Sequence, residues 1–382
     1  MAISEPTSTL VAGMVSFNGL IPIFGTTGSS GVSETEKGLM TIPSYANWVS
    51  RFNSSSYKTT GPTGAWAQEW WTVYNYLQYG GICVVGATGS TGDYYSASGV
   101  LTASNTPLHN KNLVNLDVVF SGGSTFSAAA AASVANTRQD CLAFLGNYKS
   151  ISSTAGYTAG STAHFGDFGV TAGSEYVCYF VGRKNSINDV IKSSTPLIIT
   201  NVGADAAGCL ARTFRIAKPW STIAGTVRGR VLSAVSLDQT FTDSVIADFA
   251  AAKVNSIQAI TNSGFCVMGN KTGYTGASAG INRLDTVNMV IYIKKQINTQ
   301  LNQFLFEPNS TQTRLNISNI INPILSKIKT SGSLFSYSVV CDETNNTPTV
   351  ISNGQLVVDI TLKQSVIAES IVVNFTIETS TS

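Results

Sequence analysis

The sequence offers few residues that could carry out chemistry. It contains two histidines, His109 and His164, which nearly excludes a histidine-rich metal site or a histidine relay. His164 lies in AHFGDFG, where a His–Asp pair could bind a ligand, although such a lone pair is more often a loop feature. Around Ser90 the sequence reads TGSTG, which lacks the first glycine of the GxSxG motif of serine hydrolases. These residues make an enzyme a weak interpretation.

Two glycine-containing stretches are the nearest candidates for a phosphate-binding loop. In GFCVMGNKT, residues 264–272, Asn270 separates Gly269 from Lys271, whereas a P-loop needs Gly, Lys and Ser or Thr together. The stretch GATGSTG, residues 86–92, follows an apolar strand pattern, but no helix start comes after it. We therefore predict no cofactor, no metal and no catalytic residue, and keep a hydrolase or nucleotide-binding enzyme only as a third interpretation.

Composition narrows the classes further. The chain of 382 residues is 43% hydrophobic and 12% charged, with a formal net charge of +2 and no block of like charges. Nucleic acid is a poor candidate partner because phosphate binding needs a clustered basic surface. The low net charge also gives little repulsion between copies, so self-association is not opposed.

Targeting signals and disulfides are not expected. The start of the chain has Glu5 and Pro6 where a signal peptide needs a basic and then an apolar segment, and no apolar run reaches the length of a membrane-spanning helix. Six cysteines are scattered singly, which is typical of reduced, mostly buried residues in a cytoplasmic assembly context.

Strand and helix patterns alternate over the first 275 residues, which predicts an α/β core with several strands in one sheet. Long loops or a small insertion are expected at 86–106 and 150–174. Helices are expected at 66–79, ended by Gly80 and Gly81, and at 127–138 and 245–255. Strands are expected at 82–85, 113–120, 141–146, 175–182, 196–203 and 257–260, the last leading into FCVMG.

The C-terminal third predicts a helical hairpin followed by strands. Apolar residues at helical spacing run from Val290 to Leu305, and Pro308 excludes a helical conformation at Glu307. Asn309 is expected to cap a second helix, with Gln312 as its reciprocal partner. That helix carries an apolar stripe from Ile317 to Ile328, with Pro323 predicting a kink or break and Gly332 its end. We name Phe306, Glu307, Pro308 and Asn309 the elbow.

Three alternating strand patterns follow the hairpin. The first has Tyr337, Val339 and Cys341 on one face, and the second has Leu356, Val358, Ile360 and Leu362 on one face. The third, at the chain end, has Ile371, Val373, Phe375 and Ile377 on one face. A long terminal strand of this kind can pair within its own sheet or with the sheet edge of a neighbouring subunit.

Six short motifs occur in order after residue 280. They are RLDTVN at 283–288, the elbow FEPN at 306–309, a helix ending at Gly332, CDETNNTP at 341–348, GQLVV at 354–358 and AESIV at 368–372. In this order they resemble the C-terminal region of contractile tail sheath proteins of bacteriophages, R-type tailocins and related injection systems. Weaker echoes are GGICVV at 80–85, DAAGCLAR at 205–212 and VNSI at 254–257. Pro323, and KQSV at 363–366 in place of a usual proline, depart from the pattern of that family.

The resemblance implies a structural protein without catalysis. Subunits of this family form six-fold rings, stacked helically around an inner tail tube, and contraction drives the tube through the host cell envelope. The implied partners are further copies of the chain, the tube protein, and baseplate and tail terminator proteins, with no direct nucleic-acid contact and no membrane insertion. The implied location is the virion tail, after assembly in the host cytoplasm. The alternative is a non-contractile tail tube or other virion assembly subunit with strand-swapped arms.

The resulting expectation is a mixed α/β subunit with two domains and extended arms. We predict an N-terminal arm at 1–20, an outer α/β domain at 21–275, a C-terminal polymerisation domain at 276–365 and a C-terminal arm strand at 366–382. The apolar residues expected in the N-terminal arm are Leu10, Val11, Val15 and Phe17. By family analogy, basic residues of the C-terminal domain are candidates to contact an acidic tube, with an ordinary solvated helix face as the alternative: Lys294, Lys295, Arg314, Lys327 and Lys329.

Overall fold

The computed structural model describes residues 18–24, 38–51, 65–88, 115–121, 128–147, 150–159, 161–187, 197–276 and 280–365. These residues fall into two compact units, Met1–Tyr292 and Ile293–Ser382. Helix α8 (Leu284–Leu301) contributes to both. The mixed α/β fold class predicted from the sequence is confirmed, whereas the domain boundaries predicted above stay a prediction.

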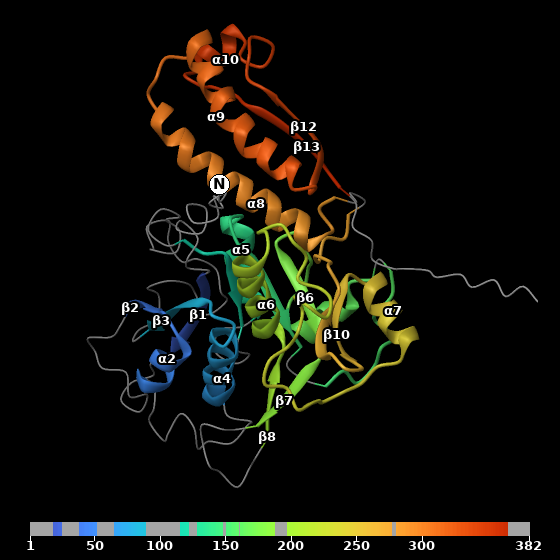
Figure 1. The fold of residues 1–382 in the computed structure, drawn as a ribbon. Helices are drawn as coiled ribbons and strands as arrows, with labels where there is room; N and C mark the ends of the chain where they lie inside the picture. The colour runs from blue at the N-terminus through green and yellow to red at the C-terminus, as the bar shows by residue number, and fades with distance from the viewer. Residues whose placement is uncertain are drawn as a thin grey trace, which may run out of the picture. The chain divides into compact units, whose positions relative to one another are not determined.

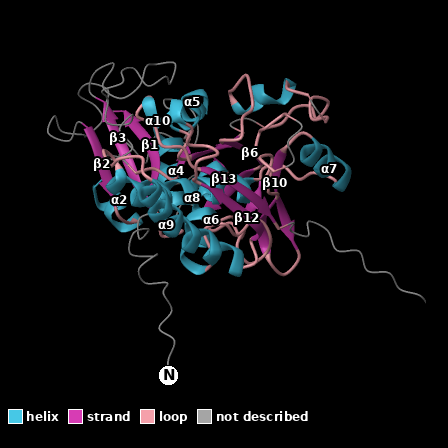
Figure 2. Cartoon of the chain, turned by 90° about the horizontal axis from the view of Figure 1, so that it is seen from above, coloured by secondary structure: helices cyan, strands magenta, loops and turns pink. Residues whose placement is uncertain are grey.

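The first unit is organised around an eight-stranded sheet with the order β11-β10-β6-β5-β4-β1-β3-β2. Its bounds are β1 (Asn18–Phe24), β2 (Gly38–Ile42), β3 (Ile82–Thr88), β4 (Val118–Phe120), β5 (Leu142–Gly146), β6 (Val177–Val181), β10 (Val254–Ile260) and β11 (Gly264–Met268). Six neighbouring strands from β10 to β3 run parallel, and β11 and β2 are antiparallel edges. Strands β2, β3 and β1 follow one another at one end of this sheet (Figure 2).

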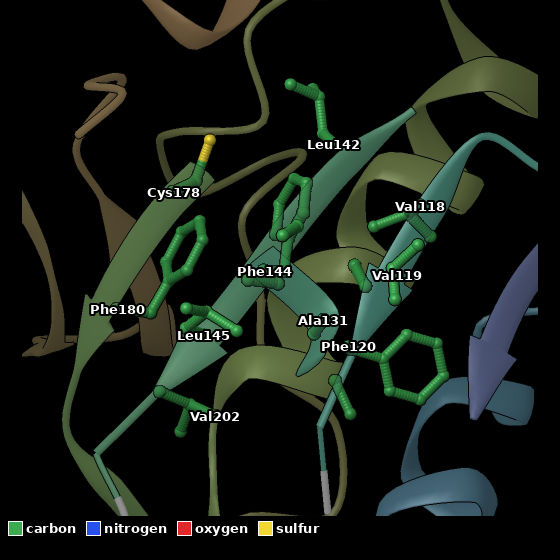
Figure 3. Packing of buried hydrophobic residues seen from close by; sticks show 14 of the residues in the cluster. Val118, Val119, Phe120, Ala131, Leu142, Phe144, Leu145, Cys178, Phe180 and Val202 are labelled. Carbon is green, nitrogen blue, oxygen red and sulfur yellow. The ribbon is translucent and has the colours of Figure 1, made fainter. Parts of the chain in front are cut away.

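Strands β4, β5 and β6 are buried along their whole length, as expected for parallel strands covered by helices. The rings of Phe144 and Phe180 stack at 5.1 Å across β5 and β6 (Figure 3). The ring of Phe120 lies 4.7 Å from that of Tyr76. Helices pack on this sheet and on each other: α2 (Tyr45–Arg51), α4 (Ala65–Leu77), α5 (Ala128–Arg138), α6 (Gly203–Ile216) and α7 (Asp243–Ala251). A small antiparallel sheet joins β8 (Leu197–Asn201), β7 (Arg183–Ile187) and β9 (Ser236–Leu237).

In the second unit, α9 (Thr311–Thr330) packs on β12 (Leu334–Val340), which pairs with β13 (Asp359–Gln364) (Figure 1). The short helix α10 (Pro348–Ser352) lies between the two strands in the chain. Buried Ile317, Ile321, Leu325 and Ile328 form the inner stripe of α9. Gly332 has φ +83° and follows the last turn, which suits a residue without a Cβ atom and agrees with the predicted helix end.

Several predicted boundaries are wrong in instructive ways. The strand predicted at 113–120 is formed only from Val118 in the described residues. The helix predicted at 245–255 ends at Ala251, because Val254 and Asn255 pair with β6 as the start of β10. The second C-terminal strand begins at Asp359 rather than Leu356.

Pro323 does not break the hairpin helix. Helix α9 runs from Thr311 to Thr330 through Pro323, whose side chain is exposed, so the predicted break is wrong. The buried stripe on both sides of Pro323 holds the two halves of α9 on the same face of β12, which offsets the lost backbone hydrogen bond.

Candidate assembly site

The elbow joins α8 to α9 in an irregular conformation. Helix α8 ends at Leu301, earlier than predicted, and a single 3-10 turn, η3 (Asn302–Phe304), follows it. Phe306 then adopts φ +72°, an unfavourable conformation for a bulky residue, and its side chain is fully exposed. Leu305 beside it is 64% exposed. The elbow therefore exposes two apolar side chains to solvent instead of burying them in a core.

The residue that caps α9 is Ser310, so the predicted cap at Asn309 is wrong. The Ser310 hydroxyl accepts a hydrogen bond from the Thr313 amide at 3.2 Å. Gln312, the predicted reciprocal partner, donates instead to Asn316. Asn309 is used elsewhere: its side-chain amide donates to the Asn346 side chain at 3.1 Å and to the Gln355 carbonyl at 2.8 Å.

Asn346 is the centre of this contact. Its side chain is buried, donates to the carbonyls of Asp342 and Val357, and accepts from the Val357 amide at 2.9 Å. Two motifs that lie more than 30 residues apart, FEPN and CDETNNTP, thus meet through the Asn309–Asn346 pair. The elbow is fastened to the segment that leads into β13.

A second set of bonds shapes the loop after β12. The Asp342 carboxylate accepts from the Thr344 amide and hydroxyl, and these hydrogen bonds lower the pKa of Asp342. Asn345 donates to the Val340 carbonyl and to the Asp359 carboxylate, at 2.8 and 2.9 Å. We call Asn309, Asn345 and Asn346 the asparagine cluster; it ties the elbow, the end of β12 and the start of β13 together.

Arg314 is not a solvated basic residue. It is 5% exposed, and its guanidinium donates to the side chain of Asn309 at 2.9 Å and to Thr311 at 3.2 Å. It also lies 3.7 Å from the exposed carboxylate of Glu343. Arg314 therefore leaves the set of predicted tube-contacting residues, because its charge is directed into its own unit.

The other predicted basic residues lie on helices. Lys294 is exposed on α8 and Lys295 is half-buried there, whereas Lys327 and Lys329 are exposed in the last turn of α9. Positive charge at this end of a helix is favourable because it faces the negative end of the helix dipole. A role for these four lysines in binding stays a prediction.

The sheet of the second unit has only two strands in the described part of the chain, β12 and β13. Each pairs with the other along one edge, and an irregular register near Leu334 turns Phe335 outward, where it is 66% exposed beside Lys363. Two-stranded sheets are marginal by themselves. The predicted arm residues, Ile371 to Ile377 and Leu10 to Phe17, lie outside the described residues; Asn18 to Leu20, at the end of the predicted N-terminal arm, belong to β1.

One of the weaker motifs, DAAGCLAR at 205–212, packs in the first unit against Tyr79, the residue before GGICVV. Buried Lys184 bonds to buried Asp205 at 2.7 Å, and the Tyr79 hydroxyl donates to the same carboxylate oxygen at 2.9 Å. Burial raises the pKa of Asp205 although Lys184 opposes this shift. Gly208 lies against the ring of Tyr79, where a Cβ atom would collide. These residues lock α6 to β7 and to the end of α4, which is a structural role.

Two of the stretches considered for enzyme function, GFCVMGNKT and the loop of His164, are held by contacts within the first unit. The GFCVMGNKT stretch forms the edge strand β11 and the turn after it. In this turn the side chain of Asn270 bonds to that of Asp285, and the side chain of Asn255 accepts from the Lys271 amide at 2.7 Å, so both residues are held by the fold itself. His164 is buried beside the rings of Tyr157 and Phe165, and burial lowers its pKa. All six cysteines are buried, which agrees with the predicted mostly buried positions. Within the described ranges, no group of residues could hold a metal ion and no helix is long and apolar enough to cross a membrane.

Sequence reasoning missed the asparagine cluster. The signal was present in the paired asparagines of CDETNNTP and in the asparagine that follows Pro308. The sequence could not show that these asparagines lie close together in the fold, because polar side chains that bond across loops follow no periodic pattern.

The fold is that of contractile sheath subunits. A chain from the helical sheath of the anti-feeding prophage in its contracted state has a TM-score of 0.69 and 17% sequence identity, covering 94% of this chain and 93% of that chain. A chain from the contracted sheath complex of the extracellular contractile injection system PVC has a TM-score of 0.69 and 15% identity, covering 94% and 91%.

The sequence itself is related to the tail sheath proteins of phages, which confirms the resemblance predicted above. The tail sheath protein of Vibrio phage KVP40 is 28% identical over 272 residues, 68% of this chain and 40% of that protein. The tail sheath protein of Enterobacteria phage T4 is 28% identical over 174 residues, 46% of this chain and 26% of that protein. The chain thus spans less than half the length of these phage relatives. No protein-family model matches it.

Proposed function

We propose that this chain is the structural, non-catalytic subunit of a contractile sheath. It polymerises as stacked six-fold rings around an inner tube, and its contraction drives the tube through a cell envelope. The observation that carries the proposal is the extent of the fold match: both units follow a sheath chain from a contracted helical sheath over 94% of this chain. The elbow and the asparagine cluster then serve as internal fasteners that let the second unit move as a rigid body.

The proposed partners are other copies of the chain, the tube protein, and baseplate and terminator proteins. The proposed location is the tail of a virion, with assembly in the host cytoplasm. A low net charge of +2 is compatible with dense packing of many copies, because repulsion between them is small.

The proposed polymer contacts are strands added to the β12–β13 sheet. Both strands pair only with each other among the described residues, so each has an outer edge with backbone groups able to bond an incoming strand. The donors are the C-terminal arm strand, residues 371–377, and the N-terminal arm, residues 10–17. Backbone pairing of this kind can survive rotation of the subunits because the arms bend while each unit keeps its core.

The exposed lysines of α8 and α9 are proposed to face an acidic tube. Charge reversal of Lys327 and Lys329 to Glu should abolish co-sedimentation with the tube protein in low salt, whereas reversal of Lys218, an exposed residue of the first unit, should not. Equal loss with both reversals would contradict a specific tube-facing surface and favour a general charge effect.

Electron microscopy of the purified full chain tests the proposal, first alone at rising concentration and then with the matching tube protein. Hollow cross-striated tubes are expected, and uniform small particles under both conditions would contradict it. The alternative, a non-contractile tube or assembly subunit, predicts a single lattice. Tubes found in two lattice states, one longer and narrower than the other, would exclude it.

A further inference from the structure

Exposed carboxylates gather at one end of the second unit. Glu307 lies in the elbow, Asp342 and Glu343 lie in the loop after β12, and Asp359 begins β13. The asparagine cluster ties these three segments together, so the four carboxylates share the end of the unit that carries the elbow. The cation beside them, Arg314, is 5% exposed and donates within its own unit. This end of the unit is therefore negative, and we call its four carboxylates the acidic end.

Four arginines of the first unit form a group of the opposite sign. The Cζ atom of Arg212 lies 5.2 Å from the centroid of the Tyr79 ring. The same guanidinium donates to the backbone carbonyls of Arg228 and Arg230, which fixes the loop that carries both of those side chains. Arg215, in the last turn of α6, donates to the Tyr79 carbonyl at 3.5 Å. We call Arg212, Arg215, Arg228 and Arg230 the arginine cluster.

The arginine cluster has no carboxylate partner in the described part of the chain. None of its members belongs to an ion pair there, and residues 206–237 contain no aspartate or glutamate. Arg215 and Arg230 are exposed, and the buried Nε atom of Arg212 bonds to none of the described residues. In a chain with a formal net charge of only +2, the cluster is a local excess of positive charge, which favours an acidic partner.

Arginine suits such a contact better than the exposed lysines of the second unit. Its guanidinium presents a fixed fork of donors to a carboxylate and is weakly hydrated, whereas lysine carries a strongly hydrated ammonium group on a flexible stem. The bonds from Arg212 already order the loop at 228–230, so less conformational freedom is lost when the cluster binds. The acidic end is likewise ordered by the asparagine cluster. The two surfaces therefore match in sign and are both preorganised.

We propose that the acidic end of one copy binds the arginine cluster of a second copy, through ion pairs between exposed carboxylates and guanidiniums. Opposite charge on two preorganised surfaces of the same chain is what selects this occupant. The inference rests on the proposed function, because it names a contact between neighbouring copies in the polymer. The contact is independent of the arm strands, and salt weakens it because both surfaces are exposed.

Two charge-reversed full chains test the contact. The arginine variant carries Arg215→Glu and Arg230→Glu, the acidic-end variant carries Glu307→Lys and Glu343→Lys, and all four side chains are exposed. With the tube protein present, each variant alone should need an about tenfold higher concentration to form tubes, because like charges then meet. An equal mixture should form tubes at the concentration of the unchanged chain, since each reversed surface then meets one of opposite sign. This rescue would also show that both variants are folded.

The matched control carries Asp243→Lys and Asp248→Lys on α7, which change two exposed carboxylates and give the same net charge as the acidic-end variant. Mixed with the arginine variant, this control should not bring the arginine variant into sedimenting tubes. Rescue by the control would show a general charge effect and overturn the inference. Rescue of the acidic-end variant by a chain with Lys327→Glu and Lys329→Glu would assign the acidic end to those lysines and overturn it as well.

Three further results would count against the contact. Tubes that form from both variants as they do from the unchanged chain would overturn the inference and leave the proposed function intact. If one chain with all four substitutions assembles and the mixture does not, the charges pair within a single chain. If neither assembles, the two surfaces do not pair. Unchanged chains that form no tubes would instead contradict the proposed function and, with it, this inference.

Discussion

Asn346 shows how much one uncharged side chain can hold together. It is 2% exposed and bonds to the elbow, to the loop after β12 and to both backbone groups of Val357. An amide is suited to this position because it donates and accepts at the same time, without the cost of burying a charge. The asparagine cluster therefore acts as a small polar core where the unit has few apolar residues to bury.

We expect Asn346→Ala to destabilise the second unit by about 2–4 kcal/mol, because several buried partners are left without a hydrogen bond at ~1–3 kcal/mol each and only partly regain water. Thermal or urea unfolding followed by circular dichroism would measure this. Asn353→Ala, in an exposed position after α10, is the control and should change stability by less than about 0.5 kcal/mol. If Asn346→Ala and Asn353→Ala lower the free energy of unfolding equally, the asparagine cluster does not act as a buried polar core.

His164 makes the stability of the first unit depend on pH. Its ring stacks on Tyr157 at 5.2 Å and meets Phe165 and Tyr179, and the Tyr157 hydroxyl donates to the carboxylate of Asp167. Burial lowers the pKa of His164, and the backbone of Gly156 and the charge of Asp167 only partly oppose this. The unfolded chain therefore binds a proton first as the pH falls below ~6.5.

Stability should consequently fall between pH 7.5 and pH 5.5, by up to about 1.4 kcal/mol for each pH unit below 6.5. The urea midpoint of the full chain, measured at both pH values, would show the loss. His164→Gln should remove most of this difference while lowering stability at both pH values. A pH dependence that persists in His164→Gln would assign it to other groups.

At the scale of elements, a buried ion pair joins α6 to the small sheet. Lys184 on β7 and Asp205 on α6 are both fully buried, and Lys184 also donates to the Leu232 carbonyl at 2.9 Å. Removing one partner leaves the other charge buried and uncompensated, which is more costly than removing both.

We expect Lys184→Met to destabilise the first unit by about 3–5 kcal/mol and the double variant Lys184→Met with Asp205→Leu to recover part of that loss. Chemical denaturation of the four chains in a double-mutant cycle measures the coupling. A double variant that is destabilised by the sum of the two single effects would show that the pair does not act as a unit.

Several elements were predicted although their ends were not, whereas β1, β2, β7 and α6 were not predicted as strands or a helix. Apolar runs such as CLAFLG and EYVCYFVG identify β5 and β6 because buried parallel strands need continuous apolar residues. The cap of α9 moved from Asn309 to Ser310 because both residues cap helices well, and Asn309 has distant partners that no local pattern reveals. Tertiary packing likewise lets α9 continue through Pro323, where local sequence alone predicts a kink or break. The assembly residues at both chain ends were predicted by pattern and resemblance, and remain predictions.

At the scale of the whole molecule, the proposed polymer depends on the C-terminal segment. Deletion of residues 366–382 removes the proposed donor strand but no residue of the described core. The truncated chain should stay folded and soluble and should no longer form tubes, as judged by sedimentation and electron microscopy. Ordered tubes from the truncated chain would rule out the C-terminal donor strand. A chain carrying Ile371→Ala and Phe375→Ala is a milder variant and should assemble only at higher concentration.

Strand β1 lies inside the large sheet, with β3 and β4 as its two parallel neighbours. A force applied to its first residue, Asn18, would act along both ladders, so that their hydrogen bonds resist sliding together and do not open one after another. Tension entering the subunit through its N-terminal end would thus be carried into the middle of the sheet from two sides. In the proposed sheath, which would work by sudden shortening, this end of β1 would be a mechanically strong point of attachment.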